Sequence, residues 1–507
     1  MARPFTRAEA LGKGAVVMRT FRHSLVVLAA WVLAAGYPAT LRADAAEMAV
    51  GARPAVTTGG WGNAIMLSGG ASVGALSCAS SGNCGGGGFR PVGQHGTEAI
   101  VVSQVHGKWG RVLAVRGLTV PKGKPNDGSV TAMACTSAGN CVAVGSYAVQ
   151  PSQSQAFIVT ERHGAWGTAA AVPGLAVLNT GKVAGLNQVT CSSAGNCSAV
   201  GTYTIKPGDG SLFTVSEVHG VWGNAATVPA VTGLPGQLTG EPAGVGLLSC
   251  PAPGNCSAAG SYQVDDNSGN QVFVMSQVNG TWGSAVEIPG TGALNTGLAA
   301  AVNAINCSSP GNCSAGGFYW TSNQFQFAFV VNQVNGTWHR AIELPGTSRF
   351  DGNWISAISC PSDGNCGAGG VENYENTERP FGSTFVVNEV HGVWYRALPI
   401  PGTNKLNVGD DAALTSISCT TAWKCGAGGF YTPGNAEAFP YWDAFVVSEV
   451  GGTWGRAVIV PGNKKENTRV NASITAISCA APGLWCTAAG YLVNNKTGTH
   501  TFVVSKP

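Results

Sequence analysis

The sequence predicts an all-β fold, an eight-bladed β-propeller of four-stranded antiparallel blades. Three observations predict it. A cysteine pair recurs every 53 to 60 residues, with five residues between its members in seven copies and six in the last. A tryptophan that follows a two-residue turn recurs with the same period. The remaining segments are strand-like, rich in Gly, Val, Ala and Thr. Eight copies of each marker indicate eight modules of about 57 residues.

Each module supplies four expected strands. The first alternates apolar and small residues up to the first cysteine, as in "SITAISC" at 473–479. The second starts at the second cysteine, as in 197–203, and the third and fourth follow, as in 444–450 and 454–462. Asn-Gly or His-Gly separates the third and fourth strands in six modules, which is typical of a tight hairpin turn.

The sixteen cysteines predict one disulfide in every module, stapling the hairpin between its first two strands. Zinc sites normally combine two closely spaced knuckles, whereas each pair here stands alone in its repeat. We therefore expect no metal and no cofactor. The expected pairs are Cys78 with Cys84, Cys135 with Cys141, Cys191 with Cys197, Cys250 with Cys256, Cys307 with Cys313, Cys360 with Cys366, Cys419 with Cys425, and Cys479 with Cys486.

The two ends of the chain predict how the ring closes. The sequence stops at "TFVVSKP", which matches a third strand, while "TTGGWGNAIML" near residue 61 matches a fourth strand. The N-terminal strand is therefore expected to complete blade 8 and remove the open edges of the ring. Residues 46–507 are expected to form a single propeller domain.

Residues 1–45 are expected to be an N-terminal extension and a secretion signal, whose start is Met1 or Met18. The apolar run at 24–36 follows basic residues and is too short to span a bilayer. Cleavage is expected after Ala45. The mature chain is then secreted, extracellular or associated with the cell wall, and a monomer. A net charge of +3 does not favour nucleic acid, and no membrane contact beyond the cleaved signal is expected.

The repeat "PG-xxx-LN-x-G … ISC-xxx-GNC-xAGGxY … FVV-xEV-xG-xW" resembles the repeats of uncharacterised secreted proteins of high-GC, actinobacterial-type bacteria. Pro289-Gly290 with Leu294-Asn295 is one instance. The resemblance covers nearly the whole mature chain and implies a propeller and secretion, with no activity to transfer. A weaker similarity to kelch repeats comes from Gly-Gly doublets such as Gly428-Gly429. The sialidase Asp-box and the WD40 signature are absent.

Most repeated polar and aromatic residues are assigned to the scaffold. The marker tryptophans and the tyrosine of "GxY" are expected to pack the blades, and an asparagine shared by several linkers is expected to cap a turn. A strand position that alternates between Glu and Gln is expected on the strand surface. Its members are Gln104, Glu161, Glu217, Gln277, Gln333, Glu389 and Glu449.

The candidate site lies where the repeat breaks. The loops between second and third strands, and those between blades, vary most and share one face of a propeller. In blades 5 to 7 these loops gather aromatic residues, which suit sugar rings or a protein partner. Burial of those aromatics within their own loops is the competing interpretation. The expected ligand-binding residues are Trp320, Phe325, Trp354, Tyr374, Tyr441 and Trp442.

A secreted binding module for a glycan or a cell-surface protein is the first functional hypothesis. The alternative is a glycosidase or polysaccharide lyase that uses paired carboxylates. The candidate catalytic residues would then be Asp410, Asp411, Asp443 and Glu375. A structural protein of the cell envelope is the third hypothesis, and it is favoured if the loop aromatics are buried.

Overall fold

The computed structural model describes residues 60–93, 96–118, 127–206, 210–238, 244–265, 269–347, 352–372, 382–409, 411–434, 441–461, 471–494 and 498–506. The chain divides into two units, Met1–Arg53 and Pro54–Pro507. The expected signal and its cleavage site therefore lie outside the described residues. No helix within the described ranges is long and apolar enough to cross a membrane.

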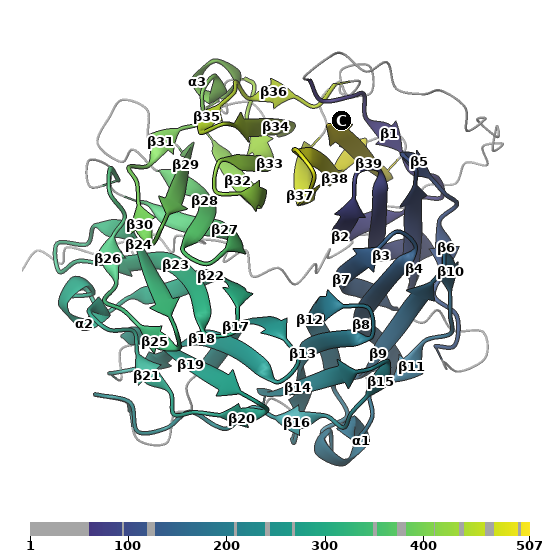
Figure 1. Cartoon of the computed structure of the whole chain (residues 1–507), viewed down its shortest axis with the longest axis horizontal. Helices are drawn as coiled ribbons and strands as arrows, with labels where there is room; N and C mark the ends of the chain where they lie inside the picture. Colours follow the sequence, from purple (N-terminus) through teal and green to yellow (C-terminus); the bar gives the residue numbers. More distant parts are fainter. Residues whose placement is uncertain are drawn as a thin grey trace, which may run out of the picture. The chain divides into compact units, whose positions relative to one another are not determined.

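The second unit is an eight-bladed β-propeller, as the sequence predicts (Figure 1). Eight antiparallel sheets stand around a common axis, and the innermost strand of each contacts that of the next blade, including blade 8 with blade 1. The innermost strands of blades 1 to 8 are β2 (Ser72–Ser80), β7 (Ser129–Ser137), β12 (Ala184–Ser193), β17 (Gly244–Ala252), β22 (Ala300–Ser309), β27 (Trp354–Ser362), β32 (Ala412–Thr421) and β37 (Asn471–Ala480).

The second and third strands form the middle of each blade. The second strands are β3 (Asn83–Val92), β8 (Asn140–Gln150), β13 (Asn196–Thr204), β18 (Asn255–Gln263), β23 (Asn312–Trp320), β28 (Asn365–Glu372), β33 (Lys424–Tyr431) and β38 (Trp485–Asn494). The third strands are β4 (Gly96–Val105), β9 (Gln153–Arg162), β14 (Gly210–Val218), β19 (Asn270–Val278), β24 (Gln326–Val334), β29 (Ser383–Val390), β34 (Asp443–Val450) and β39 (Gly498–Lys506).

In blades 1 to 7 the fourth strand is two short pieces rather than the continuous strand expected from the sequence. In blade 1, Trp109 pairs with Gln104 and Leu113 with Val101, so the register shifts between the pieces. Such a bulge twists and shortens the exposed edge, which discourages pairing with another chain. The pieces are β5 (Lys108–Trp109) and β6 (Leu113–Ala114), β10 (Ala165–Trp166) and β11 (Ala170–Ala171), β15 (Val221–Trp222) and β16 (Ala226–Thr227), β20 (Thr281–Trp282) and β21 (Val286–Glu287), β25 (Thr337–Trp338) and β26 (Ile342–Glu343), β30 (Val393–Trp394) and β31 (Leu398–Pro399), and β35 (Thr453–Trp454) and β36 (Val458–Ile459).

The expected closure of the ring is confirmed. Strand β1 (Ile65–Met66) pairs antiparallel with β39, the last strand of the chain. The Trp61 indole donates to Ser448 Oγ of blade 7 at 3.1 Å, and Ala64 N donates to the Pro461 carbonyl at 2.8 Å. The N-terminal strand therefore completes blade 8 and also ties it to blade 7.

All eight expected disulfides are confirmed, each within one blade, and no cysteine of the described chain is free. The half-cystines lie opposite each other inside the ladder, as Cys191 opposite Cys197. In blade 3 the first strand continues for two residues after Cys191, and the second strand begins one residue before Cys197. Ser193 then pairs with Asn196. The hairpin turn is therefore two residues long, shorter than the five-residue loop expected.

Every innermost strand carries a bulge, and this bulge explains a glycine of the repeat. In blade 5 the register shifts between Val302 and Ala304, which brings the Ala301 carbonyl close to the second strand. A β-carbon on Gly317 would fall 1.8 Å from that oxygen, so only glycine fits. In blade 7 the bulged residue reaches the next blade: Thr415 Oγ1 donates to the Ile474 carbonyl at 2.7 Å.

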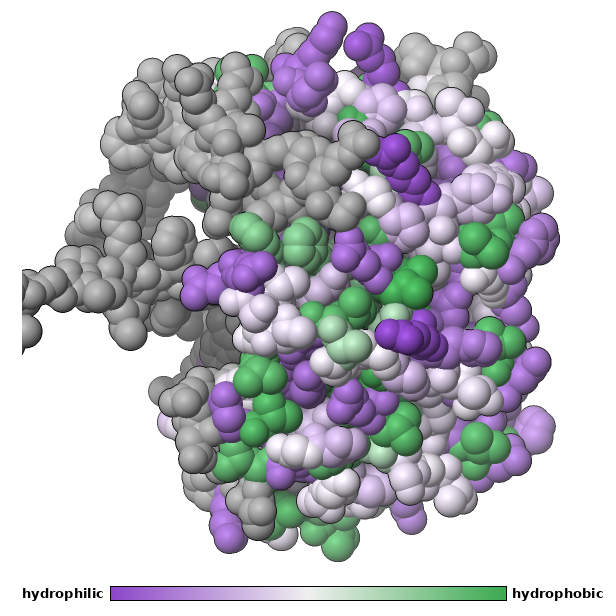
Figure 2. Space-filling view, turned by 90° about the vertical axis from the view of Figure 1, so that its left-hand side faces the viewer, coloured by the Kyte–Doolittle hydropathy of each residue, from purple (hydrophilic) through white to green (hydrophobic). Residues whose placement is uncertain are grey.

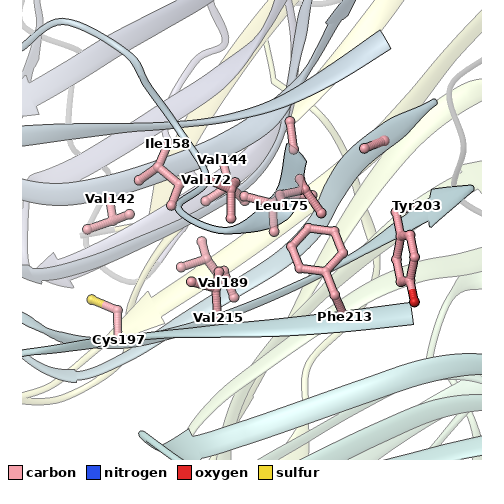
Figure 3. Close-up of a cluster of buried hydrophobic side chains, with 14 residues drawn as sticks. Val142, Val144, Ile158, Val172, Leu175, Val189, Cys197, Tyr203, Phe213 and Val215 are labelled. Carbon is pink, nitrogen blue, oxygen red and sulfur yellow. The ribbon is translucent and has the colours of Figure 1, made fainter. Parts of the chain in front are cut away.

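Apolar side chains between neighbouring blades form the core. Between blades 2 and 3, Val144 and Ile158 pack against Val189 and Phe213 (Figure 3). Helix α1 (Leu175–Leu178) lies in the linker between these blades and adds Leu175 to the cluster. Two further one-turn helices, α2 (Thr291–Leu294) and α3 (Thr403–Leu406), occupy the linkers before blades 5 and 7.

The asparagine after each of these helices caps a turn, as expected. Asn295 Oδ1 accepts from Ala299 N at 2.9 Å, and Asn407 Oδ1 accepts from Thr432 N at 3.2 Å. The turn histidines and asparagines, such as His106 and Asn279, have positive φ angles of 47° and 48°, as their hairpin position requires. These residues therefore hold turns and loops in place.

Candidate functional site

The long loops of the second-to-third strand connections and of the linkers share one face, which we call the loop face. The tight turns share the other, where Gly107 N donates to the Gly82 carbonyl at 2.8 Å. Of the candidate residues on the loop face, Tyr374, Glu375 and Asp410 lie outside the described residues. The others fall into two groups, and no ring contact among described residues joins them.

The first group lies where blade 5 meets blade 6. Gln326 pairs with Trp320, and the Gln326 carbonyl accepts from Gly352 N and Asn353 N at 3.0 and 3.1 Å. These bonds bring Trp354 next to the hairpin that carries Trp320. The structure therefore brings together two of the predicted aromatics from separate blades.

Both tryptophans differ from the expectation that they stand in loops. Trp320 is the last residue of β23 and Trp354 is the first residue of β27, and both are half-buried. Phe325 is more open, with 40% of its surface exposed. Its ring lies 6.4 Å from that of Phe327, which in turn lies 6.0 Å from Tyr319. Phe325 is thus the outer member of an aromatic row in blade 5.

The second group lies on blade 7. The Trp442 ring packs against Phe430 with centroids 4.7 Å apart, and its indole Nε1 donates to Asp411 Oδ2 at 3.2 Å. Burial raises the pKa of Asp411, and the hydrogen bond from Trp442 opposes that rise. Tyr441, half-buried, precedes Trp442 in the chain. Trp442 is therefore held on its face by a phenyl ring and at its edge by a carboxylate.

The two described candidate carboxylates have separate partners. Ala412 and Asp443 both pair with Tyr431, which places the backbones of Asp411 and Asp443 two strand spacings apart, about 10 Å. Asp443 Oδ2 accepts from the Tyr431 hydroxyl at 3.3 Å, while Asp411 accepts from Trp442. Each carboxylate is bound to an aromatic side chain of its own blade.

The tyrosine of the "GxY" motif has an acidic partner in three blades, which sequence reasoning missed. Tyr262 donates to Glu287 at 2.9 Å and Tyr319 to Glu343 at 2.8 Å, both on fourth strands, whereas the partner of Tyr431 is Asp443, opposite it on the third strand. Burial and the neighbouring carboxylate raise the pKa of all three hydroxyls. All three rings are buried, so these pairs stabilise the scaffold, as expected for the tyrosines.

The alternating Glu/Gln position is buried, and its assignment to the strand surface was wrong. All seven of its side chains are at most 6% exposed, and Lys506 takes the same register in blade 8. The side chains lie between blades: Asn332 of blade 5 donates to Glu389 of blade 6, and Asn388 of blade 6 donates to Glu449 of blade 7 at 2.7 Å. Burial raises the pKa of Glu389 to about 6 and that of Glu449 to about 7.

Two cavities of the described structure lie away from the predicted site. One, of about 230 Å³, is an open groove between blades 2 and 3, walled by Trp222, Ile158 and Arg162. The other, of about 10 Å³, lies beside Glu389 and is too small for more than a single water. No cluster of His, Cys, Asp or Glu able to hold a metal occurs within the described ranges.

Comparisons with known proteins find distant structural neighbours only. No protein-family model matches the chain, and no curated protein matches it. YCF48 from Cyanidioschyzon merolae aligns with 12% identity over 75% of this chain and 96% of its own, with a TM-score of 0.40. A Trypanosoma rangeli sialidase complexed with 2,3-difluorosialic acid aligns with 10% identity over 78% of this chain and 55% of its own, at a TM-score of 0.31. A neuraminidase-like protein of a flat-faced bat influenza virus, subtype N11, aligns with 9% identity over 67% of this chain and 96% of its own, at 0.33. These similarities are too distant to transfer a function.

Proposed function

We propose that this chain is a secreted binding propeller whose ligand is a glycan, held on the loop face of blades 5 to 7. The observation that carries the proposal is the Trp442 group. A tryptophan stacked on Phe430 and hydrogen-bonded to Asp411 is held rigid, so binding a sugar ring on it costs little ordering entropy. The exposed Phe325 in blade 5 would add a second apolar contact.

The proposed location outside the cell follows from the cysteines. Eight disulfides in one domain are typical of oxidising compartments. The apolar run at 24–36 would supply the export signal. A cell-surface glycan would then be the accessible ligand, and we propose that the propeller acts as a monomer with no cofactor.

Binding is favoured over catalysis because Asp411 and Asp443 each serve an aromatic partner. A general acid or a nucleophile must instead face the scissile bond in a cleft. The carboxylates would orient the ligand's hydroxyl groups, while the ring faces supply contact area.

The test is a glycan and polysaccharide screen of the secreted chain, scored for binding and for turnover. Trp442→Ala is expected to weaken binding of any glycan found by about 1–3 kcal/mol, as for a stacked anchor. Val177, which is 81% exposed on α1, supplies the control: Val177→Ala should leave binding unchanged. Turnover that disappears in Asp443→Asn would overturn the proposal in favour of an enzyme.

A further inference from the structure

The outer edge of blades 5 to 7 carries a run of residues that most other repeats lack, although blade 1 shares the arginine as Arg111. The residue after the marker tryptophan is His339 in blade 5 and Tyr395 in blade 6. The six other blades have glycine there, namely Gly62, Gly110, Gly167, Gly223, Gly283 and Gly455. The next residue is arginine in blades 5, 6 and 7, whereas blades 2, 3, 4 and 8 have Thr, Asn, Ser and Asn. Since all blades share one backbone, the scaffold does not require these side chains.

The three arginines are Arg340, Arg396 and Arg456, and each lies at a boundary between blades. A β-carbon built on the linker glycine Gly290 would fall 2.5 Å from Cγ of Arg340, and Gly346 stands in the same relation to Arg396. Glycine in the linker thus lets the arginine stem cross it. All three residues are exposed, and none forms an ion pair with a described carboxylate. Three neighbouring boundaries therefore present guanidinium groups that no carboxylate of the described ranges neutralises.

An exposed aromatic pair stands at the boundary of blades 6 and 7, which Arg456 also borders. The Tyr395 and Trp423 rings meet edge to face, with centroids 5.9 Å apart at 70°. They remain 52% and 37% exposed. Trp423 occupies a turn position where other blades have a glycine such as Gly82, so this contact is absent elsewhere in the ring.

We propose that this surface, the basic rim formed by Arg340, Arg396, Arg456, Tyr395 and Trp423, binds an acidic polysaccharide. Guanidinium groups bind carboxylate and sulfate oxygens in a forked geometry, and exposed ring faces accept the apolar face of a sugar. A polymer that alternates anionic groups with rings offers both chemistries along its length. In the view onto the rim of blades 5 and 6, strongly hydrophilic side chains stand singly among apolar ones (Figure 2).

The compartment favours polysaccharide over nucleic acid as the ligand. The eight disulfides indicate an oxidising environment, where polysaccharide is the abundant polyanion. The proposal for the basic rim does not rest on the proposed glycan site of the loop face.

The test measures binding of the full chain to polygalacturonate and to its fully methyl-esterified form, which keeps the sugar rings but lacks the charge. We expect the acid form to bind at least about tenfold tighter at low salt, with the preference lost as salt screens the charges. Alginate, hyaluronan and heparin extend the series and show whether carboxylate or sulfate is preferred. An oligothymidylate of matched charge tests the nucleic-acid alternative.

Two sets of variants separate the contribution of the arginine charges to affinity from that of the aromatic rings. The triple variant R340Q/R396Q/R456Q is expected to lose about tenfold in affinity and most of the salt dependence. The double variant Y395G/W423G restores the residues of the other blades and should lose several-fold at every salt concentration. Arg111 has the same repeat position in blade 1, where Gly110 replaces the aromatic, so R111Q is the matched control and should change affinity less than twofold.

Three results would overturn the proposal. The first is equal binding of the acid and the ester, or no binding to any of the acidic polysaccharides. The second is a loss of affinity in R111Q that, measured as a change in log Kd, reaches one third of the loss in the triple variant. That result would indicate diffuse positive charge. The third is tighter binding of the oligothymidylate through the same arginines. Unchanged melting temperatures confirm that each variant is folded, and W442A should leave these affinities unchanged.

Discussion

At the scale of single residues, the buried glutamates are the least expected feature of this chain. Glu449 is 1% exposed, and its Oε2 has no hydrogen-bond partner in the described structure. Glu389 receives hydrogen bonds from Ser314 and Asn332, whereas Glu449 receives one from Asn388 alone. The additional donor explains why burial raises the pKa of Glu389 only to about 6 but that of Glu449 to about 7.

The raised pKa values predict how stability depends on pH. A carboxyl with a folded pKa above its unfolded value of about 4.5 does not affect stability while both states are protonated. Between the two pKa values, the carboxyl is ionised in the unfolded chain but still protonated in the folded chain. The folded state therefore loses stability as the pH rises, until the pH exceeds the folded pKa. The free energy of unfolding should therefore fall from pH 5 to pH 7.5, as denaturant titrations at several pH values can measure.

Replacing Glu449 by glutamine should remove most of that loss. Blade 5 has glutamine at this position, and Gln333 Nε2 donates to the Gly336 carbonyl at 3.2 Å, so Gly452 offers the equivalent acceptor in blade 7. Glu449→Gln is expected to raise the free energy of unfolding at pH 7.5 by on the order of 2 kcal/mol, with no change at pH 4.5. The reverse change, Gln333→Glu, should steepen the pH dependence, and a flat profile for both would contradict this account.

The sequence could not reveal this burial because alternation in a strand separates two faces without saying what covers them. In an isolated sheet, the face that carries Glu and Gln would be the solvated one. In a propeller both faces of the inner three strands pack against neighbouring blades, so the polar position becomes an inter-blade contact. The same limit applies to Trp354, whose place at the start of β27 was mistaken for a loop. By contrast, the turn histidines and the disulfides follow from local geometry alone and were predicted correctly.

At the scale of elements, the innermost strands are joined by a hydrogen bond that recurs around the ring. The residue before the first cysteine of one blade accepts from the backbone of that cysteine in the next, as Ser359 Oγ from Cys419 N and Ser418 Oγ from Cys479 N, both at 3.0 Å. Blade 2 has Ala134 at this position and offers no such acceptor to blade 3. The "SC" of the repeat is therefore a link between blades and not only the end of a strand.

Exchanging these residues should shift stability in opposite directions. Ser359→Ala removes the acceptor for Cys419 N and is expected to cost about 1 kcal/mol of unfolding free energy, the usual net value of a hydrogen bond. Ala134→Ser adds an acceptor where the repeat lacks one and should gain a similar amount or slightly less. Both are measured by denaturant unfolding without reductant, and equal effects of the same sign would contradict the proposed link.

The element scale also shows how far the candidate site could be predicted. Loop composition singled out Trp442, whose ring packs against Phe430 on the loop face. It could not show that Asp411 serves the indole, since a side-chain partner 31 residues away leaves no local pattern. The basic rim was missed because its residues deviate singly from the repeat. A comparison of all eight copies at each position would have revealed Tyr395 and Trp423.

At the scale of the whole molecule, three sets of inter-blade hydrogen bonds hold the ring, two from the innermost strands and one from the linkers. The bulged residues of the innermost strands form the inner set, as Thr475 with the Val73 carbonyl across the closure. The serines before the cysteines form the next, as Ser478 with Cys78 N. Linker prolines form the outer set, as the Pro401 carbonyl with Ala457 N at 2.8 Å. The inner two sets also pass between blade 8 and blade 1, so the closure has these hydrogen bonds in common with other blade boundaries.

These shared hydrogen bonds predict that the chain can be cut elsewhere if blade 8 is joined covalently. In the other blades a two-residue turn connects third and fourth strands, and Gly62 N already donates to the Ser505 carbonyl at 2.8 Å. A permuted chain that links Pro507 to Gly60 by Asn-Gly, and opens in the linker between blades 1 and 2, should keep the melting temperature within a few degrees. Deleting residues 46–67 instead exposes the edge of β39 and removes the buried Trp61, which alone should cost about 3–5 kcal/mol. Calorimetry measures the melting temperatures of both chains. If the deletion variant has the melting temperature of the parent, or the permuted chain has that of the deletion variant, the strand at 60–67 does not close the ring.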